Sequence, residues 1–233
     1  MPERGNSIFD LLLLILIFAL FCSAPYLYGQ WMSARRRNHL EKWAASKGLT
    51  FSPEKDRSME SLCPDLVELQ RGSDRYACNI MKGKCSGRPF LAFDYHYTYK
   101  QGRSYGHHHF SVVAVPCGLP LKPLFITSED LSSRISTAAG SEDINFESAE
   151  FSRRFFVKAE DRRWAYDVLH ARTMEFLLEQ NPRFQIQLGG RHVYAWRTTG
   201  FRISDFECAI ETACGILDRL PEYLVEKLRD NPS

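Results

Sequence analysis

The chain has 233 residues and a mass of 26.9 kDa, enough for one ordinary domain with an appendage and too few for two large domains. Hydrophobic residues make up 44% and charged residues 25%, which excludes a wholly disordered, collagen-like or low-complexity chain. The formal net charge is +2, but four Arg and two acidic residues lie within residues 1–37, so 26 basic and 26 acidic side chains remain from residue 38 onward. A body without a basic surplus is not expected to bind nucleic acid.

A long apolar stretch near the N-terminus predicts a membrane-spanning helix. Residues 11–34 carry no charged side chain, and they begin with LLLLILIFALFCSA. A hydrocarbon core about 30 Å thick is crossed by about 20 helical residues, and residues 8–28 supply that length in contact with the lipid bilayer. Tyr and Trp side chains followed by the basic triplet of residues 35–37 are typical of the cytoplasmic interface, and only Arg4 precedes the span. The pattern predicts a single-pass protein of the cell inner membrane whose C-terminal domain is cytoplasmic.

The alternative interpretation is a cleaved secretory signal. Arg4 would then form its charged start, residues 11–21 its apolar core, and residues 22–24 (CSA) its cleavage site. Pro25 directly after that site opposes cleavage, and the basic triplet opposes export of the body. We therefore expect the apolar stretch to remain in the chain as an anchor.

The sequence divides into an anchor and a body. We expect residues 1–37 to comprise an N-terminal tail, a transmembrane helix and a basic juxtamembrane stop, and residues 38–233 to form a cytoplasmic α+β domain. The basic stop is also a candidate for contact with anionic lipid headgroups. Seven Cys, an odd number with no C-x-x-C pair, predict reduced thiols rather than a disulfide framework or a zinc ribbon.

A short helix and a β-rich stretch follow the basic triplet. Residues 38–47 (NHLEKWAASK) predict a helix that stops at Gly48. Period-two alternation predicts strands at residues 76–82 and 89–99. In the second strand the apolar and Tyr side chains occupy one face, and Ala, Asp, His and Thr occupy the other face.

The next strand, residues 107–115, is expected to return beside this one and to end at Pro116. A two-residue turn at Gly102 and Arg103, with positive φ at the glycine, would close the hairpin. This turn pairs Tyr97 with His108, Tyr95 with Phe110, and Phe93 with Val112. The apolar faces of both strands then agree, which supports the register.

The second half of the body mixes helices with further strands. Its pattern predicts a strand at residues 120–127, a loop at 128–148, a strand at 151–158 and a helix at 160–180. A hairpin of residues 184–188 and 191–197 is then expected to turn at Gly189 and Gly190. The capping box of Ser204 and Glu207 opens a last main helix, and a final turn or short helix follows at 221–228. Hairpins interleaved with two main helices indicate an α+β fold with a largely antiparallel sheet.

The segment between Asn145 and Ala195 carries a set of apolar core positions and one hairpin pattern. These are Phe146, Phe151, the FFV run of residues 155–157, Asp161, Ala165, Leu169 and the F-x-I-x-L-G-G hairpin from Phe184. In these positions the chain resembles a broad family of uncharacterised bacterial membrane-anchored proteins. The resemblance implies one or two N-terminal spans before a cytoplasmic α+β domain of unknown function, and it supplies no catalytic residues.

One group of side chains has the composition of a metal site. In the hairpin register above, His96 lies opposite His109, His107 lies diagonal to His96, and Asp94 stands two residues before His96. Three imidazoles with a carboxylate form a ligand set that zinc accepts. The alternative is a solvated sheet face whose histidines contact water or neighbouring polar groups, and the spacing matches no established metal motif.

Other candidate sites in the sequence are weaker. The row of Tyr95, Tyr97 and Tyr99 is expected to be the core face of the sheet rather than a ligand platform. Phosphate-binding glycine loops, the G-x-S-x-G elbow and H-E-x-x-H do not occur, so no catalytic residue and no cofactor-binding residue is assigned.

Two functions follow from these observations. The first is a non-enzymatic, membrane-anchored protein whose cytoplasmic domain is an interaction or regulatory module for an unknown membrane or cytoplasmic protein partner. The second is a zinc-dependent hydrolase that uses His96, His107 and His109 as metal ligands, with Asp94 orienting a ligand or acting as a base.

Overall fold

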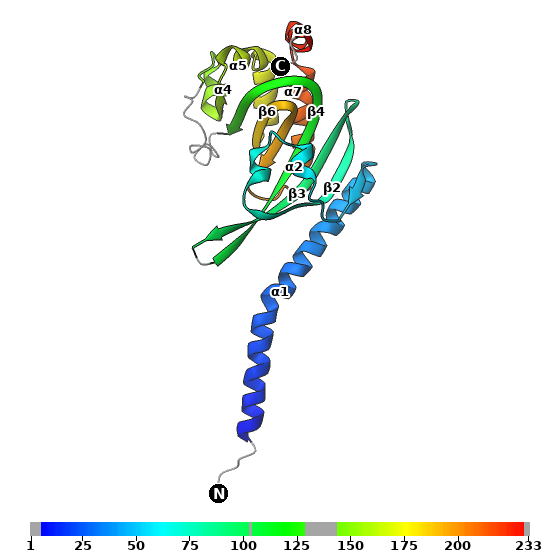
Figure 1. Ribbon diagram of the computed structural model, residues 1–233, viewed down its shortest axis with the longest axis vertical. Helices are drawn as coiled ribbons and strands as arrows, with labels where there is room; N and C mark the ends of the chain where they lie inside the picture. The colour runs from blue at the N-terminus through cyan, green and yellow to red at the C-terminus, as the bar shows by residue number, and fades with distance from the viewer. Residues whose placement is uncertain (1–5, 103, 129–143, 231–233) are drawn as a thin grey trace. The chain divides into compact units, whose positions relative to one another are not determined.

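The computed structural model describes residues 6–102, 104–128 and 144–230. The chain forms two compact units, Met1–Trp43 and Ala44–Ser233. Most of the predicted loop at residues 128–148, and Arg103 of the predicted turn, lie outside the described residues. Figure 1 shows the N-terminal helix and the α+β domain that follows it in the chain.

The N-terminal unit is built from α1 (Asn6–Ser46), the one helix among the described residues that is long and apolar enough to span a membrane. Its Leu, Ile and Phe side chains from Phe9 to Phe21 are more than half exposed, as expected of a helix whose apolar groups face lipid. The helix predicted at residues 38–47 is the end of α1 rather than a separate element, because good helix formers continue through the basic triplet. The predicted stop at Gly48, where φ is +66°, is confirmed.

The second unit is built on an antiparallel sheet. Its strands are β1 (Thr50–Ser52), β2 (Ser73–Cys85), β3 (Arg88–Gln101), β4 (Ser104–Ser128), β5 (Phe155–Ala159) and β6 (Gln185–Arg197). The path runs β1-β2-β3-β4-β5, and β6 pairs with β4 along its other edge. β4 is therefore the central strand, paired with β3 over its first half, with β5 over its second half, and with β6 along both.

The predicted register of the β3–β4 hairpin is confirmed at every pair. Tyr97 lies opposite His108, Tyr95 opposite Phe110, and Phe93 opposite Val112, and Gly102 has φ +63°. The returning strand does not end at Pro116. It continues through a register shift between Pro116 and Leu121 and joins the strand predicted at residues 120–127, so that both belong to β4. Proline is tolerated there because the ladder is already irregular.

The hairpin predicted at Gly189 and Gly190 is wrong. Residues 185–197 form one continuous strand, β6, in which Ile186 pairs with Ile126 and Val193 pairs with Val115 of β4. Gly190 lies opposite Leu121, in the irregular part of β4, and adopts φ +56°. The two glycines therefore match a bulge in the neighbouring strand instead of reversing the chain.

Helical elements cover both faces of the sheet. They are α2 (Met59–Leu62), the 3₁₀ helix η1 (Val67–Gln70), α4 (Ala149–Arg154), α5 (Arg162–Val168), α6 (Ala171–Gln180), α7 (Ile203–Asp218) and α8 (Glu222–Asp230). One face packs Phe93, Tyr95 and Phe110 under the α2–η1 segment, where the Tyr95 hydroxyl donates to the Leu69 carbonyl at 2.8 Å. The opposite face is covered by α7, which contacts β2, β3, β4 and β6. The α+β class with an antiparallel sheet and packed helices is confirmed.

Two further predictions in the second half are corrected. The helix predicted at residues 160–180 is two helices, α5 and α6, because His170 is extended and its Nε2 lies 2.8 Å from the Arg219 carbonyl oxygen. The strand predicted at 151–158 begins only at Phe155, because the Ser148 hydroxyl accepts from the Phe151 amide and caps α4.

Gly190 provides a test of the continuous strand. Ala at position 190 is expected to destabilise the domain by about 1–3 kcal/mol, because a side chain at positive φ is strained and its Cβ would displace the Asp65 carboxylate. Gly189→Ala is the control, since no heavy atom lies closer than 3.9 Å to a Cβ placed there. Thermal unfolding of the full chain, followed by circular dichroism, measures both variants. Equal losses in the two variants would contradict the assigned backbone.

Candidate functional site

The three predicted histidines are brought together by β3 and β4. His96 pairs with His109 across the two strands, and His107 pairs with Thr98, so the three rings share one face of the hairpin. The His96 and His109 ring centroids are 4.6 Å apart, and the His96 Nε2 lies 3.1 Å from the His107 Nδ1. The cluster inferred from the alternation is therefore present as a spatial group.

The hydrogen bonds of His96 define its tautomer. Its Nδ1 lies 3.1 Å from the Asp74 carbonyl oxygen, which can only accept, so this nitrogen carries the proton. The Nε2 of neutral His96 is then an acceptor, and the His107 Nδ1 donates to it. Asp74 presents its carbonyl from a left-handed conformation, with φ +47°. Both nitrogens of this 4%-exposed imidazole are thus engaged.

Two residues outside the predicted cluster extend it into a column. The Tyr76 ring stacks on His96 with centroids 4.6 Å apart and an interplanar angle of 28°, and the Lys55 ammonium lies 4.1 Å from the Tyr76 ring centroid. We call Lys55, Tyr76, His96, His107 and His109 the histidine column. Sequence reasoning missed Lys55 and Tyr76, because a cation–π pair between a loop and β2 leaves no local pattern. The cross-strand pairing of Tyr76 with His96 was the available signal.

The surroundings of His96 and His109 favour the neutral form of both rings. Burial lowers the pKa of His96, and the nearby His107 and Lys55 lower it further, against the opposing effect of Asp74. Burial also lowers the pKa of His109, with His96, His107 and His108 acting in the same direction against Asp94. Neutral imidazoles accept hydrogen bonds and bind metals through a lone pair.

Asp94 takes part in a separate buried network on the same face. Its carboxylate accepts from the Asn79 amide at 2.8 Å and from the Ser111 hydroxyl at 2.6 Å. The Ser111 oxygen also accepts from the Phe201 amide at 2.8 Å, which ties the start of the α7 segment to the sheet. A bulge in β2 places Asn79, with φ +50°, against the carboxylate. This face is buried rather than solvated at Asp94 and Ser111.

The predicted tyrosine row divides between the core and the surface. Tyr95 and Tyr97 are buried beneath the α2–η1 segment, as expected for a core face. Tyr99, nearer the end of the hairpin, is 40% exposed.

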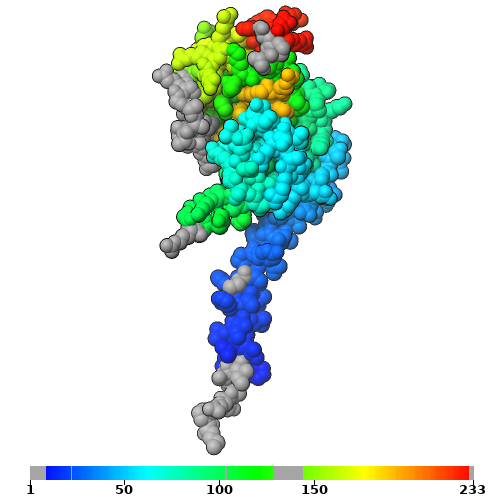
Figure 2. All heavy atoms as spheres, viewed as in Figure 1, coloured from blue at the N-terminus to red at the C-terminus, as the bar shows by residue number. Residues whose placement is uncertain are grey.

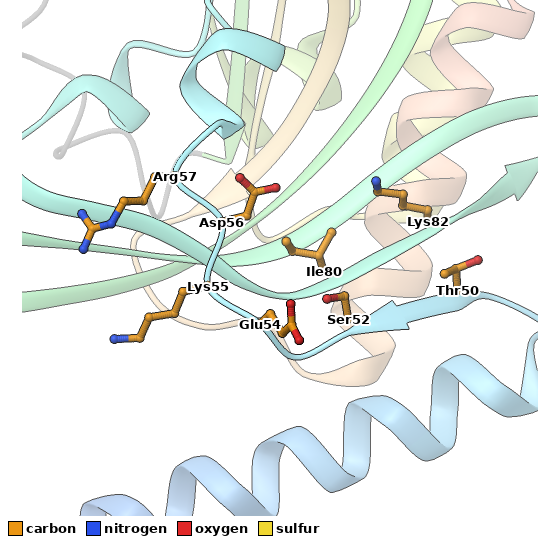
Figure 3. A pocket seen from close by; sticks show the side chains of 8 residues that line it. All are labelled: Thr50, Ser52, Glu54, Lys55, Asp56, Arg57, Ile80 and Lys82. Atoms are coloured by element: carbon orange, nitrogen blue, oxygen red, sulfur yellow. The ribbon is translucent and has the colours of Figure 1, made fainter.

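A shallow pocket of about 530 Å³ has Lys55 of the histidine column among its lining residues (Figure 3). Two of its charged groups are engaged in hydrogen bonds: Arg57 donates to the Asp74 carboxylate at 2.7 Å, and Asp56 accepts from the Ser58 hydroxyl at 2.6 Å. The lining mixes three basic and two acidic side chains, so it favours no single class of charged ligand. The residues are Thr50, Ser52, Glu54, Lys55, Asp56, Arg57, Ile80 and Lys82.

Taken together, these features define a class of protein: a candidate membrane helix that leads into an α+β domain with an antiparallel sheet, consistent with membrane anchoring. The chain is similar in fold to the crystal structure of the mycobacterial trehalose monomycolate transport factor A, TtfA, with a TM-score of 0.52. The match covers 80% of this chain and 93% of the other, at 11% sequence identity, so the likeness is one of fold. No protein-family profile and no curated protein sequence matches the chain.

The lowered histidine pKa values predict a pH-dependent stability. An ordinary His titrates near pH 6.5, so on acidification the unfolded chain takes up these protons before the folded chain does. Stability is therefore expected to be full above about pH 6.5 and to fall as the pH drops toward the folded pKa values. Urea unfolding of the full chain at pH 7.5 and pH 5.5, followed by near-ultraviolet circular dichroism, measures the loss. The variant His96→Gln has no imidazole to protonate at position 96, so it should lose less stability between pH 7.5 and pH 5.5. An equal loss would show that the lowered His96 pKa does not contribute to the pH dependence.

Proposed function

We propose that this protein is a single-pass anchored factor of a bacterial inner membrane whose cytoplasmic domain binds a membrane or cytoplasmic protein partner in support of transport. The observation that carries the proposal is one candidate span continuous with a domain that shares the fold of a transport factor. The function is binding and regulation rather than catalysis.

The cytoplasmic orientation is supported by the ends of α1. Tyr26, Tyr28 and Trp31 are each more than half exposed, and the Arg35 guanidinium lies 5.3 Å from the Trp31 ring centroid. Aromatic side chains beside a basic cluster suit the headgroup zone on the cytoplasmic side. Only Arg4 provides basic charge before the span.

A binding role agrees with how the polar groups of the domain are used. Asp94, Ser111 and Asn79 bond one another and the Phe201 amide, and His96 bonds Asp74 and His107. Such groups stabilise the sheet and its cover, because a buried polar group costs free energy unless it is hydrogen-bonded. The Ser111 hydroxyl beside the Asp94 carboxylate is fully buried and also accepts from the Phe201 amide, so it is engaged in holding the fold rather than presented to a substrate.

The orientation is tested with reporters fused to the C-terminus of the full chain. Alkaline phosphatase, active only outside the cytoplasm, is expected to be inactive, and green fluorescent protein is expected to be fluorescent. Replacing Arg35, Arg36 and Arg37 with Gln should invert a measurable fraction of the chains, because the charge bias is then lost. Active phosphatase on the unaltered chain would overturn the cytoplasmic placement.

The partner is tested by crosslinking in intact cells. The full chain should capture a defined protein partner, and a variant whose apolar span is replaced by an unrelated span of equal length should still capture it through the domain. Failure of both chains to capture any defined partner would oppose the proposed binding role.

The second candidate function is a zinc-dependent hydrolase at His96, His107 and His109. Two imidazoles on one tetrahedral zinc hold their nitrogens about 3.3 Å apart, close to the 3.1 Å between the His96 Nε2 and the His107 Nδ1. The His96 Nδ1–H bond to a backbone carbonyl is also the support that metal-bound histidines usually have. Zinc bound there would supply an activated water. Within the described part of the chain, however, no three His, Cys, Asp or Glu side chains are already arranged to hold a metal, so the His109 ring would have to turn.

Metal analysis separates the two functions. The full chain, purified in detergent without a His tag or chelators, is expected to carry far less than one zinc per molecule by elemental analysis if it is a binding module. About one zinc per chain, the content of a catalytic site, that is lost in His96→Ala would favour the hydrolase. His108→Ala is the matched control, because His108 pairs with Tyr97 on the opposite face of the same β3–β4 hairpin.

A further inference from the structure

The end of the β3–β4 hairpin projects beyond the rest of the α+β domain (Figures 1 and 2). It carries two exposed aromatic side chains: Tyr99 is 40% exposed and Tyr105 is 68% exposed. Lys100, paired with Tyr105 across the strands, is exposed as well. We call these three residues the hairpin tip.

Exposed tyrosines elsewhere in the domain are tied into the fold. The Tyr166 hydroxyl donates to the Asn145 carbonyl at 3.1 Å, and the Tyr223 hydroxyl donates to the Asp167 carboxylate at 2.9 Å. The Tyr105 side chain, in contrast, makes no hydrogen bond and no ring contact among the described residues. No described contact within the domain therefore accounts for an exposed tyrosine at position 105.

The backbone holds the tip in a defined shape. Eleven consecutive pairs join β3 to β4 without a register shift, from Leu91 and Ala114 to Gln101 and Ser104. The Tyr99 ring lies over Gly106, where any Cβ would overlap it, and it meets the Tyr97 ring edge-on at 6.4 Å. A preorganised hairpin loses little conformational entropy on binding.

The alternation of side chains places aromatic groups on both faces of the tip. Tyr99 projects from the face that continues into the core, and Tyr105 and Lys100 project from the face of the histidine column. A hairpin that lies flat on a partner uses only one face. Aromatic groups on both faces instead suit a tip that inserts end-on into a fluid environment, which can contact both faces at once.

We infer that the hairpin tip is a second membrane contact, which enters the headgroup zone of the bilayer that holds α1. Tyrosine places an apolar ring and a hydroxyl across the boundary between hydrocarbon and water, and Lys100 attracts anionic headgroups. The chain uses the same chemistry at the end of its span, where Tyr26, Tyr28 and Trp31 precede three Arg residues. Only six residues separate Arg37 from the start of the domain at Ala44, so the domain is tethered close to that surface.

This inference rests on the proposed membrane anchoring and adds a lipid-binding site to it. The experiment uses the full chain in vesicles of phosphatidylcholine, with or without phosphatidylglycerol. The photoreactive residue p-benzoylphenylalanine replaces Tyr105 or Tyr99 at the tip, or Tyr166 or Tyr223 as controls of comparable exposure. Mass spectrometry after irradiation identifies what each position has bound.

Lipid adducts are expected at positions 105 and 99 and not at positions 166 and 223. Lys100→Gln should lower the yield at position 105 about fivefold in anionic vesicles, the factor expected for one basic contact, and should leave it unchanged in phosphatidylcholine alone. Tyr105 is the decisive position, because its replacement disturbs no described contact.

Three results would overturn the inference: protein adducts at the tip, equal lipid adducts at all four positions, or no adducts at the tip. Carbonate extraction of the same vesicles distinguishes a failure of the hairpin-tip inference from a failure of the proposed membrane anchoring. A chain that resists extraction without tip adducts refutes the hairpin contact alone, and a chain released by carbonate refutes the membrane anchoring as well.

Discussion

The pairing of β4 with three other strands is the constraint on which the rest of the domain depends. Its first half positions β3 and therefore the histidines, its second half holds β5, and its opposite edge holds β6 along both halves. The shift between Pro116 and Leu121 divides these two halves. A continuous central strand, with two register shifts between Pro116 and Leu124, lets a single ladder organise segments that lie more than 80 residues apart in sequence, as in the pairing of Ser111 with Arg197.

The buried polar network follows from this pairing. Ser111 lies on β4 opposite Asp94 of β3, and its hydroxyl both donates to that carboxylate and accepts from the Phe201 amide. The link joins the centre of the sheet to the segment that begins α7, so the position of the covering helix depends on the strand register. If β4 slipped by one residue along β3, Ser111 would turn to the other face, among the aromatic rings, and its hydrogen bond to Asp94 would be lost. The network therefore selects the register as much as it stabilises the fold.

Sequence reasoning succeeded where the determining interactions are local. Alternation in both strands and a glycine at the turn were sufficient to define the β3–β4 register, and with it the proximity of His96 and His109. Sequence reasoning failed where contacts between residues far apart in the chain determine the local structure. Gly189 and Gly190 have the composition of a turn, but the irregular segment of β4 opposite them keeps the chain extended. Likewise, the break between α5 and α6 depends on a bond from His170 to Arg219, 49 residues away. Lys55 and Tyr76 of the histidine column belong to this second kind.

The two faces of the hairpin near its tip impose different requirements on one short segment. Near the centre of the sheet, the polar groups on each face are buried and need hydrogen-bond partners within the domain. The Tyr95 hydroxyl bonds the Leu69 carbonyl, and His96 bonds Asp74 and His107. Toward the tip this requirement lapses, because the covering segments no longer reach it and Tyr105 stands exposed. A soluble hairpin would normally place charged or small residues there, since exposed aromatic groups favour association. The proposed anchoring would place a bilayer within a few residues of the domain, and the interface of that bilayer would give the aromatic side chains of the tip a favourable environment without aggregation.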